Sequence, residues 1–160
     1  SAHVNTSGGN TVGSASTSLI GNECAAERAA KALAKLIPTT GVTIAGRTHL
    51  HLAEVQVFDL DGNNVALGAD TTMSSEGWNG KKERGVDGNT DGRWGAGTTF
   101  HTNGRGNTWG VSFPGVQIDK IVLWNRTDCC GDRISGSKMT IHGPNLKATL
   151  PNFSKSWTWK

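Results

Sequence analysis

Residues 121–134 read IVLWNRTDCCGDRI, and this stretch decides the fold predicted for the chain. Its first four residues, Ile121 to Trp124, are apolar and partly β-branched, as expected of a buried strand. After Trp124 the residues become polar, charged and turn-forming. The stretch therefore predicts a strand that ends in a charged loop at the rim of a β scaffold.

The loop after Trp124 combines fixed charge with paired thiols. Arg126 and Arg133 are permanently charged forks that suit planar or vicinal acceptors, and Asp128 can hold the loop by accepting backbone N–H bonds. Cys129 and Cys130 are adjacent, which predicts a bond to each other and an apolar sulfur surface. A link from Cys24 to either one is the alternative pairing. A solvated turn without function is the plainer interpretation of this loop.

The composition favours a single all-β domain. The chain has 160 residues, with Gly 22, six Trp and no Tyr, which suits a turn-rich sandwich better than a helical bundle. The net charge of +3 is small and scattered, so no nucleic-acid partner is predicted. No segment has the apolar length for membrane insertion, and no signal peptide is evident. Sequons at Asn5, Asn125 and Asn152 permit a secreted, extracellular or cell-surface location.

Three regions are predicted along the chain. Residues 1–18 are rich in Ser, Gly, Thr and Asn and form an extended or flexible arm. Residues 19–41 hold a helix and a connector, and residues 42–160 hold the sandwich. The helix is expected over Glu23–Ile37, with Asn22 as its N-cap and with Pro38 and Gly41 ending it. Its apolar stripe consists of Ala26, Ala29, Ala30, Leu33, Leu36 and Ile37. The stripe either covers the chain's own sandwich or contacts another subunit.

The remaining segments alternate between short strands and glycine-rich turns. Within Leu50–Phe58 the apolar positions change phase after Leu52, which predicts a bulge near Ala53 and Glu54. Loops are expected from Asp70 to Asn107. This pattern favours a β-sandwich or jelly roll. The predicted strands are Val42–Ile44, Leu50–Phe58, Val65–Leu67, Trp109–Phe113, Ile118–Trp124, Lys138–Ile141 and Trp157–Trp159.

A second group of polar residues lies at residues 86–92, which read VDGNTDG. Asp87 and Asn89 place hard oxygen ligands at alternate positions around glycines, as in a calcium-binding turn. An Asx-rich turn without metal is equally compatible with this composition. His101 follows in the next loop, where its ring could bond to a ligand hydroxyl.

Taken together, these residues resemble a known family. His101, Arg126, Asp128 and Arg133 reproduce the spacing HX24RXDX4R of F-type lectins, the fucolectins, and the adjacent cysteines fall within it. The resemblance extends over about Leu50–Ile141. It implies a discoidin-like, galactose-binding β-sandwich that recognises terminal L-fucose on glycans.

The resemblance also implies roles for individual residues. His101, Arg126 and Arg133 would donate to the axial 4-hydroxyl, the 3-hydroxyl and the ring oxygen of the sugar. Cys129 and Cys130 would pack on its apolar edge and Trp94 on its methyl group, while Asp128 would support Arg126. A stabilising Ca²⁺ would be held by side-chain oxygens of Asp87, Asn89, Thr98 and Glu54 and by the carbonyls of Arg84 and Ala53.

The order of the motifs departs from the family. The run Leu50–Val55 resembles a strand that normally ends the lectin domain, and Asn64–Leu67 resembles the opening strand. A circular permutation would account for this order. Alternatively, Leu50–Phe58 closes the sandwich of a neighbouring chain.

Two classes of function follow from the sequence. The first is a fucose-binding lectin, and the second is a structural or assembly subunit that forms homo-oligomers through residues 1–37 and Cys24. An enzyme is not predicted, because the chain has no Ser/His/Asp arrangement, no paired catalytic carboxylates and no HExxH motif.

Overall fold

The computed structural model describes residues 24–160, so the predicted arm of residues 1–18 lies outside the described part. The chain divides into two units, Ser1–Leu33 and Ala34–Lys160. The described part of the first unit is helical, and the helix of residues 24–34 ends before Pro38. The predicted end at Ile37 was wrong, because residues 35–37 already turn toward the first strand. Among residues 24–160, no helix is both long and apolar enough to cross a membrane.

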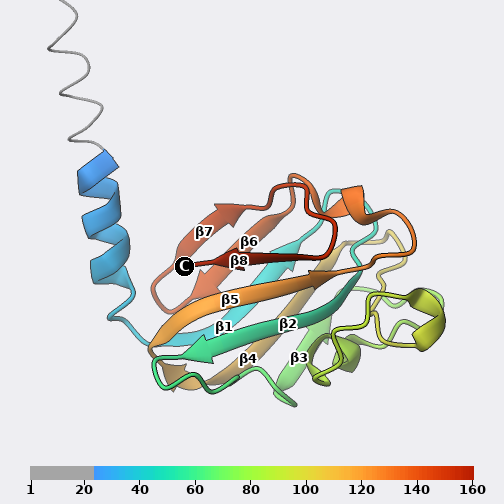
Figure 1. Ribbon diagram of the computed structural model, residues 1–160, viewed down its shortest axis with the longest axis horizontal. Coiled ribbons are helices and arrows are strands. Elements are labelled where there is room, and N and C mark those ends of the chain that lie inside the picture. The colour runs from blue at the N-terminus through green and yellow to red at the C-terminus, as the bar shows by residue number, and fades with distance from the viewer. Residues whose placement is uncertain (1–23) are drawn as a thin grey trace, which may run out of the picture. The chain divides into compact units, whose positions relative to one another are not determined.

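The second unit is a sandwich of two antiparallel sheets (Figure 1). The larger sheet has the strand order β3-β4-β1-β6-β7, and the smaller has the order β2-β5-β8. The prediction of an all-β sandwich with a helix near its N-terminus is therefore confirmed. The elements are β1 (Thr39–Ala45), β2 (Leu52–Asp59), β3 (Asp70–Met73), η1 (Lys82–Val86), η2 (Trp94–Ala96), β4 (Thr108–Val116), β5 (Ile118–Asn125), η3 (Gly131–Ile134), β6 (Lys138–His142), β7 (Leu146–Thr149) and β8 (Ser156–Trp159).

The core lies between the two sheets because apolar residues alternate along their strands. In β5, Ile121 and Leu123 are fully buried, whereas the residues on either side of them are less so. Ile44 of β1 and Met139 of β6 are adjacent in the larger sheet and equally buried. Each such aliphatic side chain contributes about 1.5–3 kcal/mol through its burial. The core therefore fixes which face of each strand is buried, and the polar residues lie in the loops that join the strand ends.

Strand β2 completes the chain's own sandwich. It pairs with β5, from Leu52 opposite Asn125 to Asp59 opposite Ile118. In this single chain the strand closes the chain's own sandwich. The register shifts between Leu52 and Glu54, where the change of phase in the sequence predicted a bulge. The bulge turns Glu54 inward, and its side chain is 0% exposed.

Other strand boundaries were predicted wrongly. Val65–Leu67 is not a strand, because the Asn64 side chain accepts N–H bonds from Val57 and Ala66 and turns the chain there. A strand does form at β3, inside the stretch expected to be loops. Strand β7 was not predicted at all. Gly41 lies within β1 and does not end the helix. A side chain at this position would place a Cβ 2.5 Å from the carbonyl oxygen of Val111 on β4, which explains the glycine.

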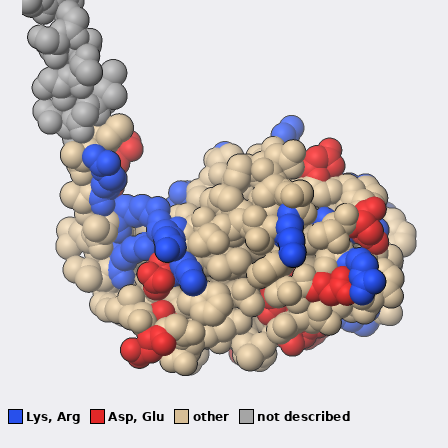
Figure 2. Space-filling model, in the orientation of Figure 1, with Lys and Arg blue, Asp and Glu red and all other residues tan. Residues whose placement is uncertain are grey.

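One face of the molecule is mostly covered by uncharged side chains (Figure 2). On the face seen in Figure 2, neutral side chains cover most of the area, and Lys and Arg are interspersed with Asp and Glu. The chain's small formal charge of +3 agrees with this mixture. This face thus presents a surface suited to neutral partners rather than to highly charged polymers.

Candidate functional site

All six residues predicted to contact a sugar line one hollow of about 370 Å³. It lies where the loop after β5 meets the loops that contain η2 and His101. Two further residues, His49 and Trp78, complete its lining. The predicted members are Trp94, His101, Arg126, Cys129, Cys130 and Arg133. Residues that are far apart in the sequence thus surround one open space of a size that suits a small ligand.

Asp128 connects the loop after β5 to η2. Its Oδ1 accepts a bond of 2.7 Å from Nε of Arg126, and its Oδ2 accepts a bond of 2.9 Å from the backbone N–H of Trp94. Although partial burial acts the other way, these bonds hold the pKa of Asp128 below its usual value. The Arg126 guanidinium also lies 5.0 Å from the centre of the Trp94 ring. Asp128 therefore orients Arg126 and leaves the two terminal nitrogens of the guanidinium for a ligand, as the sequence predicted for a supporting residue.

The base of this loop is closed by Asn125. Its side-chain N–H₂ donates to the carbonyls of Gly131 and Phe153, both at 2.8 Å, and its Oδ1 accepts from the backbone N–H of Arg126 at 2.8 Å. Asn125 is buried, so its sequon cannot carry a glycan in the folded chain. Asn152 is exposed, whereas Asn5 lies outside the described residues.

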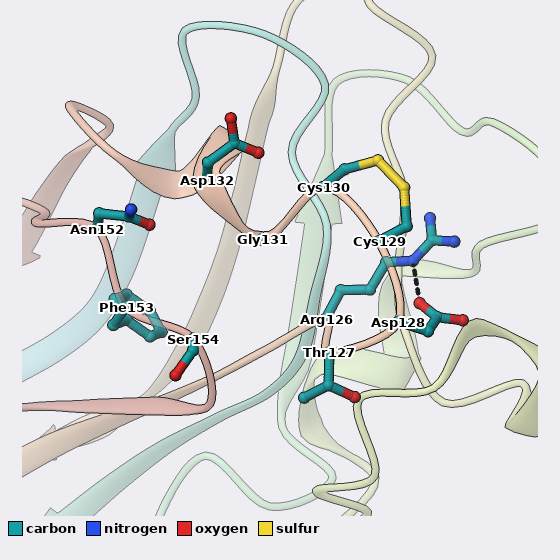
Figure 3. A pocket seen from close by; sticks show the side chains of 10 residues that line it. All are labelled: Arg126, Thr127, Asp128, Cys129, Cys130, Gly131, Asp132, Asn152, Phe153 and Ser154. Carbon is teal, nitrogen blue, oxygen red and sulfur yellow. Dashed lines mark hydrogen bonds and ion pairs between the residues drawn. A yellow bond between two sulfur atoms is a disulfide. The ribbon is translucent and has the colours of Figure 1, made fainter.

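Cys129 and Cys130 are bonded to each other, as predicted, and Cys24 is a free, exposed thiol. The disulfide and Arg126 line both the hollow around His101 and a neighbouring hollow of about 380 Å³, whose lining is drawn in Figure 3. The neighbouring hollow is also lined by Asn152, Phe153 and Ser154, which Figure 3 shows across the loop from the disulfide. The two sulfur atoms therefore form a ridge with an open space on each side.

His101 is held in one tautomer by its own backbone. Its Nδ1 lies 2.5 Å from the carbonyl oxygen of Thr102, and because a carbonyl only accepts, Nδ1 carries the hydrogen. Burial is the largest cause that lowers the pKa of His101, and the positive charges of Arg133 and Arg126 act in the same direction. The ring is therefore neutral near pH 7, with Nε2 as an acceptor. The resemblance implies a donor at this position, whereas this tautomer leaves Nε2 to accept, so the role of His101 toward a sugar stays a prediction.

A second histidine, His51, lies behind His101. The two rings stack at 5.2 Å with 17° between their planes. Burial lowers the pKa of His51 to about 3, and nearby positive groups add to the effect. Neither of its ring nitrogens has a hydrogen-bond partner within the described part of the chain. His51 is thus a neutral packing surface for His101, which the sequence did not predict.

Of the residues predicted to bind calcium, Asp87 interacts with Glu54. The Glu54 Oε1 accepts from the N–H of Gly88 at 3.0 Å, whereas its buried Oε2 has no partner among the described residues. Burial, with a further contribution from the nearby Asp87 carboxylate, raises the pKa of Glu54 to about 8. Two carboxyl groups, one of which has an oxygen without a partner, are hard oxygen donors of the kind that suits a calcium ion.

The other predicted ligands belong to the same loop. Asn89 donates its N–H to Oδ1 of Asp87 at 2.9 Å and accepts the N–H of Asp91 at 3.0 Å. The Thr98 hydroxyl donates to the carbonyl of Asp91. The described residues contain no cluster of three or more His, Cys, Asp or Glu side chains that could hold a metal. A calcium ion here would need amide, hydroxyl and carbonyl oxygens besides the two carboxylates.

Two predicted carbonyl ligands flank this group. Ala53 is fully buried beside the bulge of β2, and Arg84 lies in η1. The Arg84 side chain donates to the carbonyl of Thr99 at 3.2 Å, which fastens η1 to the segment that leads to His101. The Arg84 side chain therefore bridges two loops.

The fold is a β-sandwich with an open hollow lined by two arginines, two histidines, two tryptophans and a disulfide. Comparison with known proteins finds sequence similarity to fucolectins. Fucolectin from Anguilla anguilla is 34% identical over 85 residues, which cover 49% of this chain and 54% of that protein. Fucolectin-6 of Anguilla japonica is 32% identical over 98 residues, 57% of this chain and 52% of that protein. Fucolectin-3 of the same species is 40% identical over 57 residues, 35% of this chain and 32% of that protein.

These matches support the assignment of the chain to the F-type lectin family. The chain spans about half the length, or less, of the curated relatives it matches. No protein-family model matches it, and no solved structure matches it significantly. By name, these relatives are fucolectins.

Proposed function

We propose that the chain is a lectin that binds terminal L-fucose of glycans in the hollow between His101, Arg126 and Arg133. The observation that carries this proposal is that His101, Arg126 and Arg133 line one open space together with the disulfide, while Asp128 accepts a bond from Arg126. The names of the relatives, which are fucolectins, point to the same sugar. The disulfide further favours a secreted protein, since such bonds persist in oxidising compartments.

The chemistry of the hollow suits a neutral sugar. Arg126 and Arg133 donate to hydroxyl oxygens without losing their charge, and Nε2 of His101 accepts from a hydroxyl. Cys129, Cys130 and Trp94 offer apolar surface to the ring edge and the methyl group of the sugar. A shallow site with a few hydrogen bonds and little buried area corresponds to millimolar to micromolar affinity.

Calcium, in this proposal, acts on the scaffold. Glu54 and Asp87, with Asn89, Thr98 and the carbonyls of Ala53 and Arg84, would hold the ion beside β2 and η1. None of these residues lines the hollow around His101. When bound, the ion would neutralise the buried carboxylate and fasten the 84–98 loop to the bulge of β2. Removal of calcium should therefore lower the stability of the fold more than it lowers the affinity for the sugar.

The test is a fucosylated glycan array read with wild-type protein and with Arg126→Ala, each with calcium and with chelator. Arg126→Ala removes charge-assisted bonds worth about 1.5–3 kcal/mol each, so affinity should fall by at least tenfold. Arg28→Ala makes the same chemical change in the helix and should leave binding unchanged. Equal binding of fucosylated glycans by wild type and Arg126→Ala would refute the site.

A second candidate function is assembly through the N-terminal region. It is favoured by the exposed thiol of Cys24 and by Leu36 and Ile37, which are 61% and 48% exposed. Such exposed apolar residues are suited to contact a second copy of the chain, and linked weak sites gain avidity. Light scattering on the full chain and on a version that begins at Thr39 tests this function. If both are monomers at the same concentration, the assembly role fails.

A further inference from the structure

We propose that Asn152 carries an N-linked glycan, whose first sugar lies in the hollow of about 380 Å³ beside the disulfide. The motif Asn152-Phe153-Ser154 is one of three sequons in the chain. This inference concerns a modification of the chain itself and does not rest on the proposed function. It assigns the second hollow to a covalently attached sugar, while the hollow around His101 stays open.

All three residues of this sequon line the same hollow. They belong to the irregular segment between β7 and β8, where Asn152 and Ser154 are exposed and Phe153 is half-buried. Figure 3 shows them across the loop from Cys129 and Cys130. Neither the Asn152 amide nor the Ser154 hydroxyl has a hydrogen-bond partner among the described residues. The two side chains that a glycan-transferring enzyme must reach are therefore accessible.

The middle residue of the sequon is held by the other described sequon. Nδ2 of Asn125 donates to the carbonyl oxygen of Phe153 at 2.8 Å. This bond fastens the segment before β8 to the end of β5. The segment therefore keeps Asn152 and Ser154 at the surface in the folded chain.

The sequon that begins at Asn125 has none of these properties. Asn125 is 1% exposed, and Nδ2 donates its two hydrogens to the carbonyls of Gly131 and Phe153. Attachment of a glycan replaces one amide hydrogen by a sugar, so it would break one of these bonds and bring a sugar into the interior. The structure thus separates two motifs that are equivalent in the sequence.

The attachment needs a donor that secretory cells supply, an oligosaccharide on a lipid pyrophosphate. The amide nitrogen of Asn152 forms a bond to the anomeric carbon of the first sugar, and the bond from this carbon to the pyrophosphate oxygen breaks. The lipid pyrophosphate leaves with the electron pair of that bond, and the amide nitrogen loses one proton. The step involves no oxidant or reductant.

The hollow has surfaces that suit the N-acetylated sugar at the start of such a glycan. The Phe153 ring and the disulfide are apolar, while the Asp132 carboxylate accepts and the Arg126 guanidinium donates hydrogen bonds. A sugar joined to Asn152 is present at a high effective concentration, so weak contacts are enough to hold it there.

The first experiment maps the glycans on the full chain, secreted from cultured animal cells behind an added signal peptide. Peptide N-glycosidase in heavy-oxygen water leaves a labelled aspartate wherever a glycan was attached, and peptide mass spectrometry locates it. Every protein also carries Asn5→Gln, so that only the two described sequons are read. We expect the label at position 152 and none at position 125. Ser154→Ala should lose the label, whereas Thr127→Val, the matched change in the other sequon, should keep it.

An unlabelled position 152 in the secreted chain would overturn the inference. So would a label that persists there in Ser154→Ala, or a stronger label at position 125. None of these readouts uses fucose, so the result is independent of whether the hollow around His101 binds that sugar.

The second experiment locates the first sugar by the rate at which the glycosidase releases the glycan from the folded protein. Phe153→Ala and Asp132→Ala keep the sequon but remove one wall of the hollow each, so release should be roughly two- to tenfold faster. Asp132 is exposed, so its variant decides the matter if Phe153→Ala does not fold. Glu83→Ala, which removes an exposed carboxylate of η1 outside this hollow, should release at the wild-type rate. Equal rates in all four proteins would refute the placement of the sugar in the hollow.

Discussion

Replacement of Glu54 by Gln tests the calcium proposal at its most buried ligand. Gln keeps the length of the side chain and can still accept the N–H of Gly88, but it removes the charge that a calcium ion needs. In wild type, Oε2 of Glu54 is buried without a partner. In Glu54→Gln, the side-chain amide likewise leaves one buried polar group without a hydrogen-bond partner. Without calcium, the free energies of unfolding of the two proteins should therefore agree to within about 1 kcal/mol.

The difference between the two proteins appears when calcium is added. An ion that binds only the folded state stabilises it by about 2.7 kcal/mol at a hundredfold excess over its dissociation constant. For a chain of this size, that corresponds to a rise in melting temperature of about 5–10 °C. Glu54→Gln should lose this rise, because the remaining carboxylate and neutral oxygens bind the ion much more weakly.

The assay is thermal unfolding followed by circular dichroism, in chelator and across a series of calcium concentrations. Glu83→Gln is the matched control, since it makes the same charge change at an exposed position of η1 and should keep the full calcium shift. A shift of wild-type size in Glu54→Gln would remove Glu54 from the metal site. Wild-type protein that melts at one temperature throughout the series would refute calcium binding itself.

Four further predictions concern the sugar site. Asp128→Asn weakens the bond that orients Arg126 and should reduce fucose affinity by roughly tenfold in titration calorimetry, with unchanged affinity speaking against a supporting role. Gly80→Ala places a Cβ 2.6 Å from the backbone nitrogen of His101, so chemical unfolding should show a loss of about 1–3 kcal/mol, and wild-type stability would show that the turn can shift freely. The pKa of His101 is lowered on folding, so the unfolded chain takes up this proton first as the pH falls; His101 alone should contribute a loss of stability of up to about 1.4 kcal/mol per pH unit below pH 6.5, beside the contributions of His51 and Glu54, and His101→Gln should remove only the His101 part of the slope in unfolding measured from pH 8 to pH 5. Asn125→Asp sets a carboxylate against two carbonyls and should cost roughly 3 kcal/mol or leave the chain unfolded in the same denaturant assay, a result that a stable variant would contradict.

The sequence predicted strands where burial alternates and missed them where it does not. The bulge at Glu54 was predictable because the apolar positions change phase in a long strand. In β3, only Thr71 is buried, so the segment has no apolar pattern to detect. Residues 65–67 are apolar and were predicted as a strand, yet only Ala66 enters the core while Leu67 is exposed. Apolar composition alone could not reveal that the Asn64 side chain replaces the ladder bonds.

The candidate site was predictable to the extent that its members share one spacing. His101, Arg126 and Arg133 could be grouped from their separations along the chain, and the structure brings them to one hollow. His49 and Trp78 belong to no such spacing, because their approach depends on how the segment before β2 and the 75–80 turn fold back on His101. A lone Trp in a turn of Gly, Ser and Asn was the one available signal.

The position of β1 and β2 at the front of the sandwich has a consequence for biogenesis. Leu52 of β2 pairs with Asn125 of β5, and Ile44 of β1 pairs with Met139 of β6. During synthesis, β1 and β2 therefore stay without these partner strands until the later residues have been made. At the usual rates of synthesis, the interval between β2 and β5 lasts roughly 3–15 seconds. Over that interval the apolar faces of both strands remain unpaired, and closure of such long loops slows folding further. We therefore expect nascent chains to depend on chaperones that shield the front strands, and yield in cells to respond to chaperone supply more than to the affinity of the finished site.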